Sequence, residues 1–150
     1  MKTLIDLEVG DVLEQPEWLV VTQDMINQFA EATGDYQWIH LDEQRCQRES
    51  PFKTTIAHGF LTASVMPKSF ETVLASSDKI ASMINYGIDS LRFLEPVKSG
   101  DSIKYQFKLV EVTNKPAGRL YKVESTCILA SSGKPALVGT FLMLAVMKPA

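Results

Sequence analysis

The stretch that follows His58 is apolar on nearly every side, and it constrains the fold more than any other part of the chain. Its apolar residues are Phe60, Leu61, Ala63, Val65 and Met66. A helix without a polar face has to be buried, so we expect a helix at the centre of the protein. Pro67 cannot donate to the preceding turn, and it therefore predicts either a kink or the first turn of a second helical segment.

Downstream of about residue 82 the pattern changes from a helical period to the two-residue period of strands. Alternation is clearest in 103–109 and 121–129, an apolar strand follows at 136–147, and 85–94 precedes them. Helices grouped before an antiparallel sheet indicate an α+β protein. One curved sheet wrapped around the buried helix is the simplest arrangement. It leaves a long edge strand, which proteins usually pair or cover, so we expect a dimer.

Ahead of the apolar helix, we expect a short strand at 17–21 and two helices. Thr22 suits the cap of the first helix, which carries an apolar stripe to Thr33 and stops at Gly34. The segment 35–41 is expected to be a connecting loop, followed by a short charged helix capped by Asp42.

The 150 residues fit one domain, 1–150, because no repeat or linker interrupts them. The net charge is −3 with no basic cluster, which argues against a nucleic-acid partner. Acidic residues interrupt the N-terminus, and the apolar strand near the C-terminus is shorter than the ~20 residues that span a membrane. We therefore expect neither a signal peptide nor a membrane partner.

The two cysteines, Cys46 and Cys127, stand alone without the spacing of a zinc site or a disulfide framework. We therefore expect no bound metal, and a reduced, cytoplasmic protein.

Both histidines lie in the least regular third of the chain, and one of them shares a short loop with a carboxylate. Asp35 and His40 are five positions apart, and His58 precedes Gly59 at the start of the apolar helix. A carboxylate and an imidazole in one cleft suit general acid/base chemistry near neutral pH. A backbone amide at Gly59 could donate to a developing oxyanion.

Each of these residues also has a purely structural interpretation. Asp35 could be a turn residue, and His40 a surface or hydrogen-bonded residue. His58 could cap or tether the loop at the apolar helix, and Gly59 could serve only close packing. From the residues alone, function stays undecided.

Three motifs resemble the MaoC-like / (R)-specific enoyl-CoA hydratase family over almost the whole chain. They are Gly34-Asp35-Tyr36-Gln37-Trp38-Ile39-His40-Leu41-Asp42, Ile56-Ala57-His58-Gly59-Phe60-Leu61 and Arg92-Phe93-Leu94-Glu95-Pro96-Val97 with Gly100-Asp101. The segment Gln37-Trp38-Ile39-His40 is similar to the corresponding segment of the NodN-like branch of this family. Gln37 and Trp38 stand where the family usually has Asn and Pro, which leaves the loop's hydrogen bonding and the pocket beside Trp38 open.

The resemblance implies a hot-dog fold, one curved antiparallel sheet around a long central helix, and a homodimer or dimer of dimers. It implies an (R)-specific enoyl-thioester hydratase, or 3-hydroxyacyl-thioester dehydratase, with Asp35 and His40 as its catalytic pair. Gly59, His58, Trp38 and Ser64 would bind the substrate or its oxyanion. No cofactor is implied, because coenzyme A or a carrier protein's phosphopantetheine belongs to the acyl-thioester substrate.

Two other functions remain open. A hot-dog thioesterase would use the same ligands, but such enzymes usually carry an acidic residue on the central helix, and 58–66 contains none. A non-catalytic acyl-thioester-binding protein of the nodulation type would not need a paired acid and base.

Overall fold

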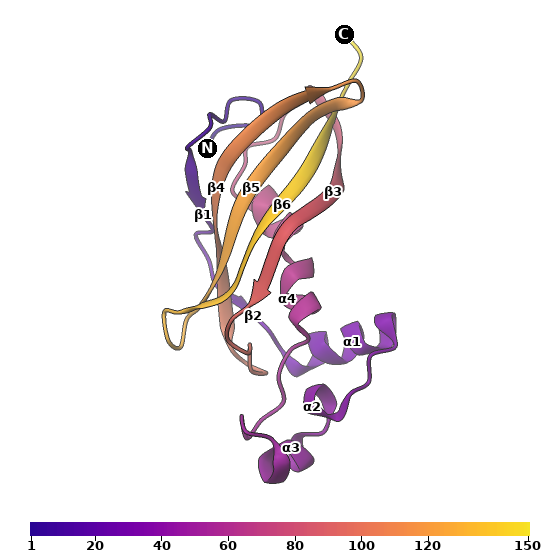
Figure 1. Ribbon diagram of the computed structural model, residues 1–150, viewed down its shortest axis with the longest axis vertical. Helices are drawn as coiled ribbons and strands as arrows, with labels where there is room; N and C mark the ends of the chain where they lie inside the picture. The colour runs from indigo at the N-terminus through magenta and orange to yellow at the C-terminus, as the bar shows by residue number, and fades with distance from the viewer.

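The computed structural model describes residues 1–150, and a curved antiparallel sheet dominates it (Figure 1). The strands are β1 (Val12–Glu14), β2 (Leu19–Val20), β3 (Ile80–Phe93), β4 (Ser102–Lys115), β5 (Gly118–Leu129) and β6 (Pro135–Met147). Their order is β1-β4-β5-β6-β3, and β2 also pairs with β4. The α+β hot-dog arrangement expected from the sequence is confirmed, although β3 begins at Ile80, earlier than the alternation suggested.

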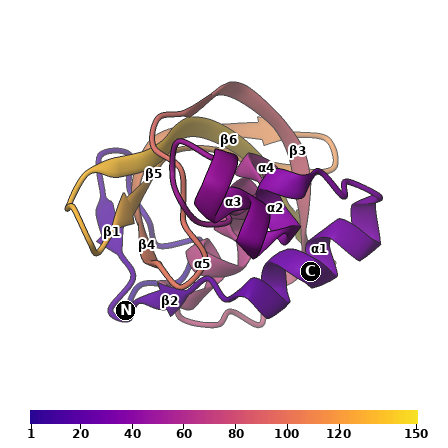
Figure 2. The ribbon, with the colours of Figure 1, turned by 90° about the horizontal axis from the view of Figure 1, so that it is seen from below.

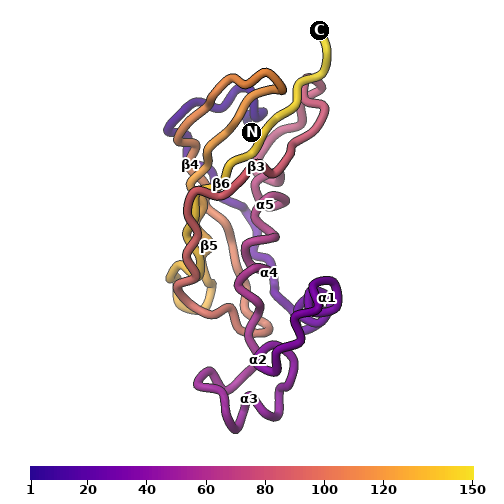
Figure 3. Tube along the Cα trace, turned by 45° about the vertical axis from the view of Figure 1, so that its right-hand side comes forward, coloured from indigo at the N-terminus to yellow at the C-terminus, as the bar shows by residue number.

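The helices lie on the concave side and at one end of this sheet. They are α1 (Gln23–Thr33), α2 (Trp38–Leu41), α3 (Glu43–Glu49), α4 (Gly59–Ser64) and α5 (Met66–Thr72). The sheet curves around α4 and α5, while α1, α2 and α3 gather beyond the start of α4 (Figures 2 and 3). None of these helices is long and apolar enough to span a bilayer.

The central helix is divided rather than continuous. Val65 is both the C-cap of α4 and the N-cap of α5, and Pro67 lies in the first turn of α5. Proline is tolerated there because the first amides of a helix have no partner within it. Of the two alternatives that Pro67 left open, the structure shows the second helical segment.

Local capping explains the two helices before the site. The Thr22 hydroxyl accepts from the Met25 amide, and Gly34 ends α1 with a left-handed φ of 79°. Asp42 caps α3 by accepting from the Arg45 amide at 3.0 Å. These caps were predicted, but two details were wrong: Thr33 is exposed, and residues 35–41 include the short helix α2.

The core lies between the concave face of the sheet and the helices α4 and α5. Alternate residues of β4 and β5, including Tyr105, Phe107, Tyr121 and Val123, are fully buried there. On α4, Leu61 and Ala63 are buried, but Phe60 is 65% exposed, so the helix is not apolar and buried on every side as expected. The outer edge strand β3 is exposed along nearly its whole length.

One buried hydrogen bond ties the sheet to the central helix. The Tyr105 hydroxyl donates to the Thr62 carbonyl at 2.8 Å. We expect Tyr105→Phe to lower the free energy of unfolding by about 1 kcal/mol, because the net contribution of such a bond is of that size. Urea unfolding at fixed protein concentration measures it, with Tyr36→Phe, on a loop where the side chain is 60% exposed, as the matched control. Equal effects of the two substitutions would show that this bond contributes nothing.

Candidate active site

Asp35 enters the site directly after α1. Gly34 ends that helix by donating its amide to the Ala30 carbonyl at 2.8 Å, and the chain then leads into α2. The Asp35 carboxylate accepts from the Gln37 amide at 3.3 Å, a local turn that is common for aspartate and leads into α2. Asp35 is half-buried, so part of the residue remains accessible to solvent.

His40 lies on α2 and is only 6% exposed. Its Nδ1 lies 2.7 Å from the Ile56 carbonyl oxygen. A carbonyl can only accept, so Nδ1 carries the proton and the Nε2 of the neutral ring is left with a free lone pair. Burial is the main cause that lowers the pKa of His40 below its ordinary value, helped by His58 and opposed by the Ile56 carbonyl and Asp35. The ring is therefore set up as a neutral base.

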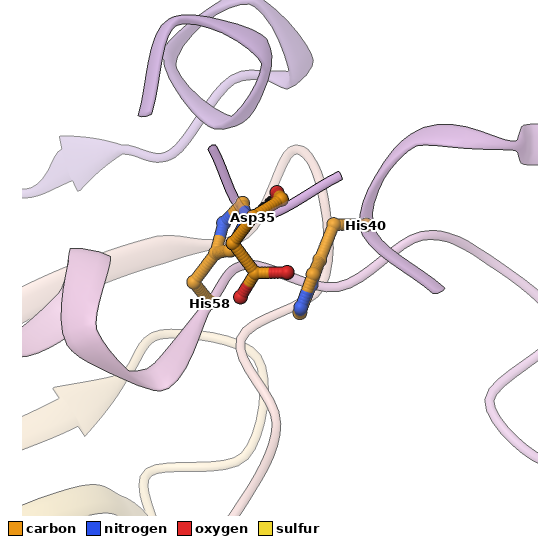
Figure 4. Close-up of side chains that lie close together, drawn as sticks. All are labelled: Asp35, His40 and His58. Atoms are coloured by element: carbon orange, nitrogen blue, oxygen red, sulfur yellow. Dashed lines mark hydrogen bonds between the residues drawn. The ribbon is translucent and has the colours of Figure 1, made fainter. Parts of the chain in front are cut away.

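His58 precedes α4 and packs against the same ring. The two imidazoles are stacked with centroids 3.8 Å apart and planes inclined by 23°. The His58 Nε2 lies 3.0 Å from the Asp35 carbonyl oxygen and must donate to it, while its Nδ1 is buried without a partner. The Phe29 ring of α1 lies 4.9 Å from the His58 ring. Asp35, His40 and His58 thus come together from two segments of the chain (Figure 4).

A second set of hydrogen bonds holds the histidine loop in place. Gln23, at the start of α1, donates its side-chain amide to the His40 carbonyl at 2.8 Å and accepts from the Thr55 hydroxyl. The Ile56 amide donates to the Ile39 carbonyl at 3.1 Å. Gln23 and Thr55 were not identified from the sequence, because a polar residue in a first turn and a threonine in a loop carry no pattern of their own.

The three clustered side chains are poorly arranged for a closed metal site. Their nearest ligand atoms lie within 4.8 Å of one another. Ligand atoms around a tetrahedral zinc are about 3.3 Å apart, given bonds of about 2.0 Å. Because the two imidazoles are stacked, their lone pairs also run side by side rather than converging on one point. The arrangement suits proton transfer better than metal coordination.

The other residues singled out from the sequence lie around this cluster. The Gly59 amide begins α4 and donates no backbone hydrogen bond, and a side chain at Gly59 would meet the Phe93 ring at 3.0 Å. Trp38 lies 4.1 Å from the Arg45 guanidinium, which also pairs with Glu49 at 2.8 Å. The Trp38 ring of α2 is therefore covered by Arg45 of the next helix, α3.

Ser64 lies apart from the acid/base cluster, near the end of α4. Its hydroxyl donates to the Leu61 carbonyl at 2.8 Å. It lines a groove of about 530 Å³ between α4 and the β3 edge, with Phe29, Phe60, Ile88 and Phe141 among the other walls. Because Phe29 also contacts His58, this apolar groove begins next to the histidine pair.

Comparisons with known proteins agree with this geometry. Residues 6–130 match the family model described as the MaoC like domain. The 3-hydroxyacyl-thioester dehydratase Z of Mycobacterium tuberculosis is 39% identical over 131 residues, which cover 86% of this chain and 85% of that protein. Nodulation protein N of Rhizobium leguminosarum bv. viciae is 35% identical over 142 residues, covering 94% and 88% of the two chains.

A solved structure shows the same architecture. The unliganded R-hydratase PhaJ1 from Pseudomonas aeruginosa superposes with a TM-score of 0.77 and 27% identity, covering 96% of this chain and 85% of that one. The matched domain, the relatives and the shared fold all indicate one conclusion. The chain belongs to the MaoC-like dehydratase family, a hydro-lyase family with the hot-dog fold.

Proposed function

We propose that this protein adds water to a trans-2-enoyl thioester to give a (3R)-hydroxyacyl thioester, and catalyses the reverse dehydration. The observation that carries this proposal is the clustering of the Asp35 carboxylate with the buried ring of His40, whose Nδ1 is bound to the Ile56 carbonyl and whose Nε2 is free. Both groups are acceptors, and together they suit one water molecule. The names of the relatives, a 3-hydroxyacyl-thioester dehydratase and an R-hydratase, support the same reaction.

The tautomer of His40 suggests how the protons move. Its Nδ1 proton is held by the Ile56 carbonyl, so Nε2 accepts a proton from the water while the oxygen attacks C3. The Asp35 carboxylate accepts a hydrogen bond from the water's other O–H, which stays on the oxygen as the new C3 hydroxyl, and stabilises the imidazolium that forms. His40 then delivers its new Nε2 proton to C2, which completes the addition of one water and leaves both residues as they began.

Attack at C3 places negative charge on the thioester oxygen. We assign the Gly59 amide as the donor to that oxygen, because it begins α4 beside His58 and has no backbone acceptor of its own. Coenzyme A or phosphopantetheine would belong to the substrate, and the reaction as proposed uses no metal or redox cofactor. The apolar groove beside Phe29 and Phe60 would hold the acyl chain.

A panel of trans-2-enoyl-CoA substrates from four to sixteen carbons tests this function. Loss of the enone absorbance without release of free thiol is the expected result. Release of free coenzyme A without hydration would instead establish a thioesterase. The structure argues against that alternative, because the nearest acidic residue of the central helices, Glu71, is exposed and pairs with Lys68. Binding without either reaction would establish a non-catalytic acyl-thioester carrier.

We further propose that β3 pairs with β3 of a second copy. This 14-residue edge strand exposes Ile84, Tyr86 and Ile88, and an unpaired apolar edge of this kind invites another strand. We expect Ile88→Lys with Tyr86→Lys to convert a dimer to a monomer in sedimentation experiments. Val12→Lys, on the opposite edge of the sheet, is the matched control and should remain dimeric. A monomeric unmodified protein would contradict this assembly.

A further inference from the structure

Two segments of the site are held together by a reciprocal pair of histidine bonds. The first segment, 34–41, carries Asp35 and His40, and the second, 55–58, carries Ile56 and His58. The His40 ring of the first segment donates to the Ile56 carbonyl of the second at 2.7 Å. The His58 ring of the second donates to the Asp35 carbonyl of the first at 3.0 Å. Each segment therefore fixes a main-chain carbonyl of the other.

The stacking of the two rings adds to this arrangement. Because the centroids of His40 and His58 are 3.8 Å apart, the face of one ring limits the position of the other. Phe29 lies against His58 at 4.9 Å, so α1 contributes to the same packing. Both rings are almost completely buried, at 6% and 3% exposed, and neither has room to turn freely.

We propose that His58 is a positioning residue, which holds the Asp35 main chain and the His40 ring so that the Asp35 carboxylate and the His40 Nε2 meet the same water. This inference rests on the proposed function and deepens it. In Figure 4 the Asp35 carboxylate and the outer end of the His40 ring project in the same direction, with His58 behind the aspartate. Moving the Asp35 carbonyl would move the carboxylate attached to the same residue.

The contacts of His58 argue against the other roles that its sequence position allows. It does not cap α4 through its side chain, because that ring makes no hydrogen bond to the helix amides. It is not placed to exchange protons with a substrate either. Its Nε2 proton is committed to the Asp35 carbonyl, and its Nδ1 is buried without a partner. Of the two structural roles expected for His58 from the sequence, capping the helix or tethering the loop, only tethering the loop agrees with these contacts.

His58 also influences the protonation of His40 through its charge. The titratable groups that act on His40 are Asp35, from the loop after α1, and His58, from the start of α4. Burial and His58 lower the pKa of His40, whereas the Ile56 carbonyl and Asp35 raise it. Replacing His58 with a neutral amide removes one cause of the lowering, so the pKa of His40 should rise.

A matched pair of amide substitutions tests the tether. A glutamine amide nitrogen reaches about where Nε2 of histidine lies, whereas an asparagine amide nitrogen matches Nδ1. We expect His58→Asn to lower kcat by about 10- to 100-fold with KM changed less than about threefold, because small misplacements of catalytic groups have effects of this size. His58→Gln should restore kcat to within about threefold of the unmodified protein, since it can still donate to the Asp35 carbonyl. A kcat for His58→Asn equal to that of the unmodified protein would overturn the proposal.

A spectroscopic measurement separates this proposal from the function on which it rests. Either variant contains a single histidine, so the imidazole ¹⁵N signals of His40 can be followed against pH without substrate. We expect the pKa of His40 to be higher in both variants, and the acid limb of kcat/KM in His58→Gln to move to higher pH. Because both variants lose the same neighbouring charge but only His58→Gln keeps the bond to the Asp35 carbonyl, the His40 ¹⁵N signals should differ between the two variants. Identical His40 signals in His58→Asn and His58→Gln would overturn the positioning role even if hydration is confirmed. If the unmodified protein hydrates no enoyl thioester, a difference between the His40 signals of the two variants still supports the tether, and only the function fails.

Discussion

Replacing Asp35 with asparagine is expected to lower kcat for enoyl-thioester hydration by about 10²–10⁴-fold, the usual contribution of a positioned acid/base group. Asparagine keeps the side-chain oxygen that accepts from the Gln37 amide, so the turn into α2 is preserved. It removes the negative charge that would hold the water and stabilise the imidazolium. KM should change little, because the carboxylate acts on the water rather than on the acyl chain. Steady-state kinetics at saturating enoyl-CoA measure both constants.

Asp24→Asn is the control for this substitution. It makes the same chemical change on the exposed face of α1, where the carboxylate accepts from the Gln28 side chain. We expect this variant to keep the kcat of the unmodified protein. If Asp35→Asn and Asp24→Asn were equally active, the Asp35 carboxylate would have no part in the chemistry.

His40→Asn should produce a loss of similar size, about 10²–10⁴-fold in kcat. The asparagine amide nitrogen lies about where Nδ1 was, so it can still donate to the Ile56 carbonyl and hold the two segments together. What it lacks is the Nε2 lone pair. A folded variant with unchanged circular dichroism and near-complete loss of turnover is the expected result. Turnover close to that of the unmodified protein would show that Nε2 is not the base.

The unmodified protein gives an independent measure of the same group. Burial lowers the pKa of His40, so the neutral ring persists to pH values below the ordinary histidine range. As the pH falls through that lowered pKa, the ring gains a proton and can no longer accept one from water. The kcat/KM should therefore be flat around neutral pH and fall at acid pH. The same fall at acid pH should be absent from the residual activity of the His40→Asn variant.

Local signals were sufficient to predict the helices that lead into the site. Thr22 and Gly34 bound α1 because their capping bonds depend only on neighbouring residues. The four-residue helix α2 was missed, because one helical turn is too short to show a period. Thr33 was placed in the core because the apolar stripe was extended one turn too far, to the exposed last residue of the helix.

The strands that were predicted correctly have one solvent-exposed face and one buried face. β4 alternates because its inner residues, such as Tyr105 and Phe107, pack on the helices while the others face solvent. The start of β3 was missed because this edge strand is exposed on both faces and has register shifts after Ile80, Asn85 and Ile88. Such a strand has no burial pattern for a sequence to display.

The site was only partly visible in the sequence. Asp35 and His40 share one loop, and their spacing was enough to suggest a pair. His58 lies 23 positions further along the chain than Asp35 and joins the pair by donating a hydrogen bond from its ring to the Asp35 carbonyl. That contact depends on how the start of α4 meets α1 and α2, which no local pattern specifies. For the same reason, the supporting bonds of Gln23 and Thr55 became apparent only in three dimensions.

The most direct test of this account compares the unmodified protein with the double variant Asp35→Asn/His40→Asn on one trans-2-enoyl-CoA. Both proteins are followed by the decay of enone absorbance, at equal concentration and after folding has been verified. The account predicts steady decay to a 3-hydroxyacyl product with the unmodified protein, and no decay above the uncatalysed rate with the variant. Equal decay with both proteins would contradict it, because hydration would then proceed without the carboxylate and the imidazole.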